Sequence, residues 1–117
     1  MSPRSARATG AAQTAPVFAA LGDETRLALL ARIGGARPLS ITQLTAGTAV
    51  TRQAVTKHLN VLAHAGLVSD ARHGRERLWQ LETSRLDEAR RYLDAISKRW
   101  DEALDRLRGY VEDKRSD

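Results

Sequence analysis

The spacing between apolar residues changes near Gly66, and this change limits the folds that are open to the chain. Up to that point the stretch TRQAVTKHLNVLAHAGLV, residues 51–68, has the period of a helix. Its apolar stripe consists of Val55, Leu59 and Leu62. Beyond it, LVSDA and ERLWQLE alternate with a period of two on either side of RHGR, a signal for two strands around a glycine turn. The sequence therefore predicts a helix followed directly by a β-hairpin, with Trp79 facing inward.

Capping residues mark the helices in this part of the chain. Asp23 is suited to cap the helix ETRLALLARI, which follows the short helical segment PVFAALG. Ser40 and Gln43 have the spacing of a capping box, so a brief helix is expected there. Thr51 can cap the longer helix, and Gly66 stands where a left-handed residue usually ends one.

The last third of the chain predicts one long helix, residues 84–113, with no proline in it. Its apolar residues recur every seven positions in two series that lie three residues apart. The two series are Leu86, Leu93, Trp100 and Leu107, and Ala89, Ile96, Ala103 and Tyr110. At ~1.5 Å per residue this helix is roughly 43 Å long, more than so small a domain can cover. We expect at least part of the seam to be a dimer interface; the alternative is a stripe that packs inside one chain.

These boundaries divide the chain into four parts. Residues 1–14, MSPRSARATGAAQT, are small and polar with glycine and proline, so they are expected to form a disordered tail. Residues 15–83 form the main domain, residues 84–113 the dimerisation helix, and residues 114–117 a short second tail.

Composition excludes several classes of protein. The 117 residues suffice for one domain with a modest core. There is no cysteine, which removes disulfides, thiolate metal sites and thiol redox switches. No apolar run approaches the ~18 to 20 residues of a membrane span, and no apolar segment follows the N-terminal arginines as in a secretory signal. The expectation is a cytoplasmic protein without membrane contact.

The positive charge of the chain is unevenly placed. The net charge is +5, and residues 85–117 hold nine basic and nine acidic residues, so the whole surplus precedes them. Residues 51–68 contain no acidic residue at all. On a helical wheel their polar side chains gather opposite the apolar stripe, with Arg52 on one flank and His58 on the other. The gathered set is Gln53, Thr56, Lys57 and Asn60, followed by His64. Such a face favours a polyanionic partner.

A short helix, a tight turn and this second helix have the order of a helix-turn-helix, whose second helix enters the major groove of DNA by its N-terminal residues. Arg52 can pair with guanine O6 and N7, and Gln53 with adenine N6 and N7. Thr56 and Lys57 are better suited to phosphates. His58 borders the apolar stripe, where packing or a phosphate contact is favoured over a ligand role.

The hairpin adds a basic wing to this unit. Arg72, Arg75 and Arg77 surround Gly74 at its tip. A basic tip on a thin ribbon can lie along phosphates or place an arginine in a narrow minor groove. The alternative is a solvated turn with no partner.

The chain resembles the ArsR-type family of winged helix-turn-helix repressors. The resemblance covers about residues 18–82 and rests on FAALGDETRLALLARI, LSITQLTAGTAVTRQAVTKHLNVLAHAGLV and GRERLWQLE. The last helix, with Trp100 inside KRWDEALDRL, is similar to one cysteine-free branch of that family. The resemblance implies a homodimer that binds an imperfect inverted repeat in double-stranded DNA and represses its own operon. It also implies that the dimer is built on the last helix and the first, with Val17, Phe18 and Leu21.

Many members of that family release DNA when they bind a metal or another effector, but two familiar metal sites are missing from this sequence. Thiolate sensors need a cysteine pair on the helix before the recognition helix, where this chain has Ala46, Gly47 and Thr48. Other members bind zinc through histidines and carboxylates of the last helix, and here no histidine follows His73. We expect no metal site and no cofactor, and the effector stays open.

The sequence thus predicts a mainly α protein with a small β-hairpin wing that binds specific duplex DNA and represses transcription as a homodimer. An enzyme is not expected, because the chain lacks a glycine-rich phosphate loop after a strand and the histidine-carboxylate spacing of metal hydrolases. The alternative is a winged helix that contacts only proteins, or an antitoxin-like partner. Duplex binding that weakens steeply with salt would separate the two.

Overall fold

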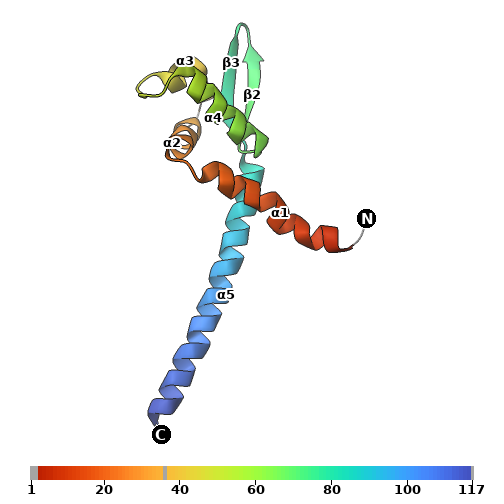
Figure 1. The fold of residues 1–117 in the computed structure, drawn as a ribbon, viewed down its shortest axis with the longest axis vertical. Coiled ribbons are helices and arrows are strands. Elements are labelled where there is room, and N and C mark those ends of the chain that lie inside the picture. The colour runs from red at the N-terminus through yellow and green to blue at the C-terminus, as the bar shows by residue number, and fades with distance from the viewer. Residues whose placement is uncertain (1–2, 36, 117) are drawn as a thin grey trace.

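The computed structural model describes the backbone of residues 3–35 and 37–116, and the side chains of residues 11–35 and 37–114. Helices dominate this part of the chain, and a small sheet lies among them (Figure 1). The helices are α1 (Pro3–Leu21), α2 (Glu24–Ile33), α3 (Ile41–Thr45), α4 (Arg52–His64) and α5 (Thr83–Ser116). The strands are β1 (Leu39–Ser40), β2 (Val68–His73) and β3 (Glu76–Leu81). The predicted mainly α architecture with a hairpin wing is confirmed.

The sheet is antiparallel and anchors the wing to the body. β3 is its central strand, with β1 on one side and β2 on the other. Leu39 of β1 pairs with Trp79 of β3, while β2 pairs with β3 along its full length. Because β1 has only two residues, the outer part of the hairpin has no third strand and projects from the body (Figure 1).

The core lies between the sheet and the helices that cover it. Trp79 is its largest fully buried side chain and faces inward, as predicted. The apolar stripe of α4 is buried with it. The other buried apolar side chains are those of Val17, Ala20, Leu29, Leu30, Ile33, Leu44, Leu67, Val68 and Ala89.

Both predicted ends of α4 are confirmed. The hydroxyl of Thr51 accepts a hydrogen bond from the backbone N–H of Ala54 at 3.1 Å. Gly66 has a φ of 78°, and a Cβ at that position would lie 2.7 Å from the Cγ of Arg85 on α5. Glycine is therefore required there both by the left-handed backbone and by the close approach of α5.

The predicted N-terminal tail is wrong for most of its length, because α1 begins at Pro3. Residues 1 and 2 lie outside the described residues. The stretch is rich in alanine, the residue with the strongest intrinsic preference for helix, and Thr14 is buried against the body. Pro16 lies inside the helix, where its ring removes one backbone donor. At the other end α5 continues to Ser116, so the short second tail is helical as well, and residue 117 lies outside the described residues.

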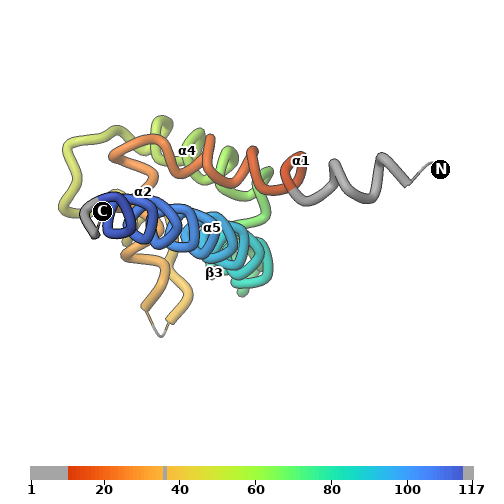
Figure 2. The backbone as a smooth tube through the Cα atoms, turned by 90° about the horizontal axis from the view of Figure 1, so that it is seen from below, coloured from red at the N-terminus to blue at the C-terminus, as the bar shows by residue number. Residues whose placement is uncertain are grey.

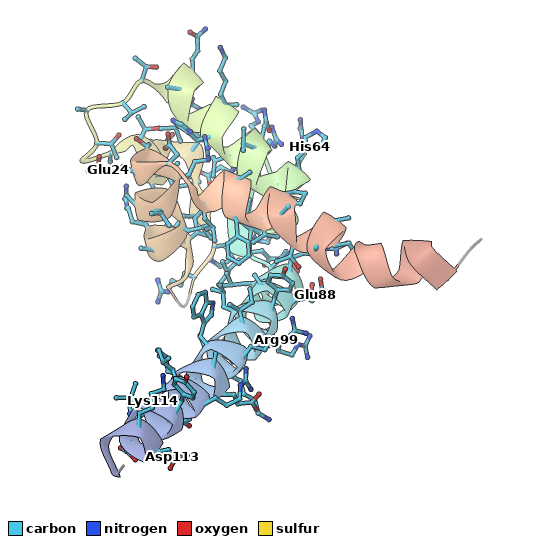
Figure 3. All side chains as sticks on the ribbon, turned by 60° about the horizontal axis from the view of Figure 1, so that its bottom comes forward. Glu24, His64, Glu88, Arg99, Asp113 and Lys114 are labelled. Atoms are coloured by element: carbon cyan, nitrogen blue, oxygen red, sulfur yellow. The ribbon has the colours of Figure 1, made fainter. Side chains whose placement is uncertain are left out.

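α5 is a single helix of 34 residues that packs against α1 near its start and then leaves the body (Figure 1, Figure 2). The Cα radius of gyration is 20.2 Å, whereas a compact domain of this length has about 13 Å. Figure 3 shows Arg99, Asp113 and Lys114 on the part of α5 beyond the other elements. A search of the described residues finds no helix with the length and apolarity of a membrane span.

Two residues predicted to lie in a dimer interface belong instead to the core of one chain. Val17 is 1% exposed and Ala89 is 3% exposed, because α1 and the start of α5 pack against each other. Phe18, Leu21 and Leu86 are half-buried against the same core. The alternative of a stripe that packs inside one chain therefore holds for the beginning of the seam.

Candidate nucleic-acid interface

The N-terminal half of α4 presents a polar surface that the body leaves open. Arg52, Gln53 and Lys57 are exposed, and together with Thr56 they line one shallow depression. The hydroxyl of Thr56 donates a hydrogen bond to the carbonyl of Arg52 at 2.9 Å, so it is already engaged with its own helix. The predicted face thus exists at the start of α4.

The electrostatics of this surface are uniformly positive. α4 has no acidic residue, and its first turn carries the partial positive charge of a helix N-terminus. Lys57 and Arg52 add two formal charges beside it. An anion that also offers hydrogen-bonding edges meets donors of both kinds on this surface.

The wing stands next to the start of α4. Its two-residue turn has Gly74 first, with a φ of 67°, and Arg75 second, as in the type II′ turns that suit the twist of a hairpin. Arg72 and Arg77 are direct cross-strand partners, so they lie on the same face of the ribbon. Arg77 donates to a carboxylate oxygen of Asp70 at 2.7 Å. The guanidinium of Arg77 also lies 5.0 Å from the ring centroid of Trp79, and these two contacts hold the side chain in place.

A cationic notch, lined by Thr42, Arg52, Arg72, Arg75, Glu76 and Arg77, joins the wing to the start of α4. Its volume is about 210 Å³. Arg52 turns toward α3, and its Nη1 donates to the hydroxyl of Thr42 at 3.5 Å. Ser40 and Gln43 form the predicted capping box at the start of α3, which fixes the backbone on that side of the notch.

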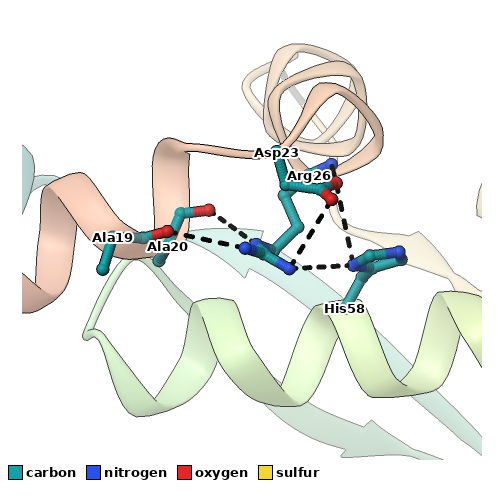
Figure 4. A network of polar contacts seen from close by, with 5 residues as sticks. All are labelled: Ala19, Ala20, Asp23, Arg26 and His58. Carbon is teal, nitrogen blue, oxygen red and sulfur yellow. Dashed lines mark hydrogen bonds and ion pairs between the residues drawn. The ribbon is translucent and has the colours of Figure 1, made fainter.

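His58 lies elsewhere, in a polar network at the junction of α1 and α2 (Figure 4). Its Nδ1 is 3.3 Å from Nη1 of Arg26 and 3.9 Å from a carboxylate oxygen of Asp23. Arg26 donates through Nε to the carbonyl of Ala20 at 2.6 Å and contacts the carbonyl of Ala19. The packing alternative describes His58 better than a DNA contact, because its ring nitrogen faces the body.

Asp23 organises this network from the start of α2. Its carboxylate accepts the backbone N–H of Arg26 at 3.0 Å, which confirms the predicted cap. That backbone hydrogen bond lowers the pKa of the Asp23 carboxyl group, and the charges of Arg26 and His58 act in the same direction. Arg26 is thus a structural partner that ties α1, α2 and α4 together.

Asn60 is also separated from the predicted face. It lines an open groove between α1 and the C-terminal half of α4, together with Pro16, Ala19 and Val61. Figure 3 shows His64 at the same end of α4, beside α1. The helical wheel gave the direction of these side chains correctly, but α1 crosses α4 where they emerge.

Of the nine residues predicted to contact DNA, seven lie together on the start of α4 and on the wing: Arg52, Gln53, Thr56, Lys57, Arg72, Arg75 and Arg77. Sequence reasoning did not include Thr42 or Glu76. The alternation of β3 is the signal for the shared face, because Trp79 points to the core and Arg77 is two residues before it. Among the described residues, no three His, Cys, Asp or Glu side chains gather as metal ligands do.

Comparison with known proteins agrees with this architecture. The helix-turn-helix domain family matches residues 21–70. An uncharacterized HTH-type transcriptional regulator of Bacillus subtilis is 40% identical over 68 residues, 53% of this chain and 74% of the relative. An HTH-type transcriptional regulator of Mycobacterium tuberculosis is 39% identical over 85 residues, 73% of this chain and 76% of the relative. The solved structure of an ArsR-like transcriptional regulator from Rhodococcus sp. RHA1 superposes with a TM-score of 0.72 at 38% identity, over 82% of this chain and 90% of that one.

Proposed function

The chain belongs to the ArsR-type family of winged helix-turn-helix transcriptional regulators, and from this we propose that it is a homodimeric repressor of an inverted-repeat operator. The observation that carries the proposal is the open surface at the start of α4, which combines Gln53, Lys57 and the positive helix end with a basic wing beside it. α4 inserts its first turns into the major groove, where Gln53 reads a base edge and Lys57 contacts a phosphate. Such a regulator acts where the chromosome is, which is the cytoplasm in our proposal.

The dimer rests on the distal half of α5. Six large apolar side chains on this helix are between 39% and 65% exposed in a single chain beyond its contact with α1: Leu93, Trp100, Leu104, Leu107, Tyr110 and Val111. A stripe of this kind in water is costly, and pairing it with a second helix removes it from solvent. A two-fold pair of chains then presents two α4 helices to half-sites about one turn of DNA apart, roughly 34 Å.

Selection of bound duplexes from a random pool tests the proposed function. The expected product is an imperfect inverted repeat, and log K for it should fall linearly with log salt because phosphate contacts release counterions. A winged helix that contacts only proteins enriches no sequence and shows no such salt dependence. Either result from the full chain decides between the two.

Gln53→Ala is expected to weaken binding to the selected operator by about 1 to 3 kcal/mol per half-site. Binding to a random duplex of equal length should change little, because an exposed neutral side chain gives nothing to non-specific attraction. Fluorescence anisotropy with both duplexes measures the two affinities. Equal losses on both duplexes would show that Gln53 does not read a base.

Zn²⁺, Cd²⁺ or arsenite at low concentration is expected to leave the operator complex intact. The chain has no cysteine, and no histidine follows His73, so neither familiar set of metal ligands of the family is present. The same anisotropy assay, with and without EDTA, measures release. Stoichiometric loss of binding that EDTA reverses would reveal a metal site built from other residues.

A further inference from the structure

The cationic notch between the wing and the start of α4 holds more positive charge than the protein itself neutralises. Four arginines and one glutamate line it. Arg77 is paired with Asp70 at 2.7 Å. Within the described part of the chain, no carboxylate lies within ion-pair distance of Arg52, Arg72 or Arg75, so three guanidinium groups share one small hollow without a partner.

The fold forces these charges together. Arg72 and Arg77 face each other directly across the hairpin, an arrangement that is destabilising for like charges. They also lie on the face of the ribbon that buries Trp79 nearer the base, so their side chains turn toward α3 and α4 and not away from the body. Arg52 meets them from α4 and leans on Thr42 of α3 at 3.5 Å.

We propose that the notch is a seat for one phosphate group, occupied by a phosphodiester of the DNA backbone, and that Arg52 therefore binds a phosphate and not a base. The inference rests on the proposed function and deepens it. Guanidinium groups offer paired N–H donors that match phosphate oxygens, and three unpaired ones converge here from α4 and the wing. One phosphate in the notch ties the wing to α4 and sets the depth at which Gln53 meets the bases.

The assignment changes what substitutions should do. Arg52→Gln and Arg72→Gln should each weaken binding of the full chain to the selected operator and to a random duplex by the same factor, about tenfold. The slope of log K against log salt should fall by about one for each notch lost. Glu76→Gln, which removes the only carboxylate lining the notch, should strengthen binding to both duplexes.

Matched controls make these outcomes decisive. Arg91→Gln removes the same charge from an exposed position of α5, opposite the apolar seam, and should leave both affinities nearly unchanged. Circular dichroism checks that each variant folds. Loss of operator binding alone in Arg52→Gln would show that Arg52 reads a base, and an Arg72→Gln protein that behaves like Arg91→Gln would show that the notch holds no phosphate. Either result overturns the proposal.

A second measurement distinguishes a backbone phosphate from a free one. Inorganic pyrophosphate, compared with chloride at equal ionic strength, should raise the Tm of the DNA-free wild-type protein, and Arg52→Gln should abolish the difference. If the difference is abolished but both DNA affinities are unchanged, the notch serves a free anion and the backbone assignment is wrong. If the wild-type chain binds no duplex at all, the proposed function fails, while the pyrophosphate result alone decides whether the notch is a phosphate site.

Discussion

Replacing Trp100 with aspartate is expected to turn the protein into monomers and to weaken operator binding by about a hundredfold or more. Trp100 is the largest side chain of the exposed seam and is 65% exposed in a single chain. Burying such a side chain stabilises an interface by about 1.5 to 3 kcal/mol, and an aromatic anchor at its centre can contribute more. A carboxylate at the same place would have to lose its hydration without a partner. A monomer keeps one recognition helix but loses the high effective concentration of the second.

Ala95→Asp is the matched control for this substitution. It adds the same charge to an exposed position of the same helix, on the side opposite the seam. Analytical ultracentrifugation should find Ala95→Asp dimeric and Trp100→Asp monomeric at micromolar concentration. A dimeric Trp100→Asp protein would exclude the seam as the interface. The exposed face of α1, with Ala12, Ala15, Pro16 and Ala19, would then be the surface to test.

Local signals allowed α4 and the wing to be predicted from the sequence. Thr51 and Gly66 mark the ends of the helix through hydrogen bonding and backbone geometry that depend on near neighbours. The alternation around Gly74 gave the hairpin and the inward direction of Trp79 in the same way. These features need no knowledge of the rest of the fold, and the structure confirms them.

The positions of His58 and Asn60 depend on neighbouring helices that the sequence pattern did not place. A helical wheel gives the direction of a side chain but not the element that it meets. α1 and Arg26 lie where these two side chains emerge, so His58 joins the network of Asp23 and Asn60 lines a groove. The N-terminal tail was misjudged for a related reason, because glycine and proline were given more weight than the alanines around them.

The partition of the seam on α5 also required the tertiary structure. A heptad repeat predicts that one face of a helix is covered, but not whether a partner or the same chain covers it. α1 covers Ala89, while nothing in the described chain covers Leu107, which is 59% exposed. The repeat is therefore shared between an internal contact at its start and an unpartnered surface farther along.

Trp79→Ala is expected to remove most of the stability of the domain. Trp79 is 1% exposed and packs at the point where the wing, β1 and the helices meet. Loss of a buried tryptophan side chain costs about 3 to 5 kcal/mol, a large share of the ~5 to 15 kcal/mol that stabilise a typical domain. The cation–π contact with Arg77 disappears as well, so the wing should loosen and DNA affinity should fall. Urea unfolding followed by circular dichroism measures the free energy of unfolding, at one protein concentration because a dimer is stabilised by association.

Trp79→Phe separates apolar packing from hydrogen bonding at the same position. In the described residues the buried Nε1–H of Trp79 has no hydrogen-bond partner, which costs about 1 to 3 kcal/mol for a group of this kind. Phenylalanine removes that unpaired donor and keeps a flat ring, while the smaller ring leaves a small cavity that costs a similar amount. The two effects oppose each other, so Trp79→Phe should unfold within about 1 kcal/mol of the wild type. A loss as large as that of Trp79→Ala would mean that the indole N–H is hydrogen-bonded in solution and that Trp79 stabilises the wing through a polar contact.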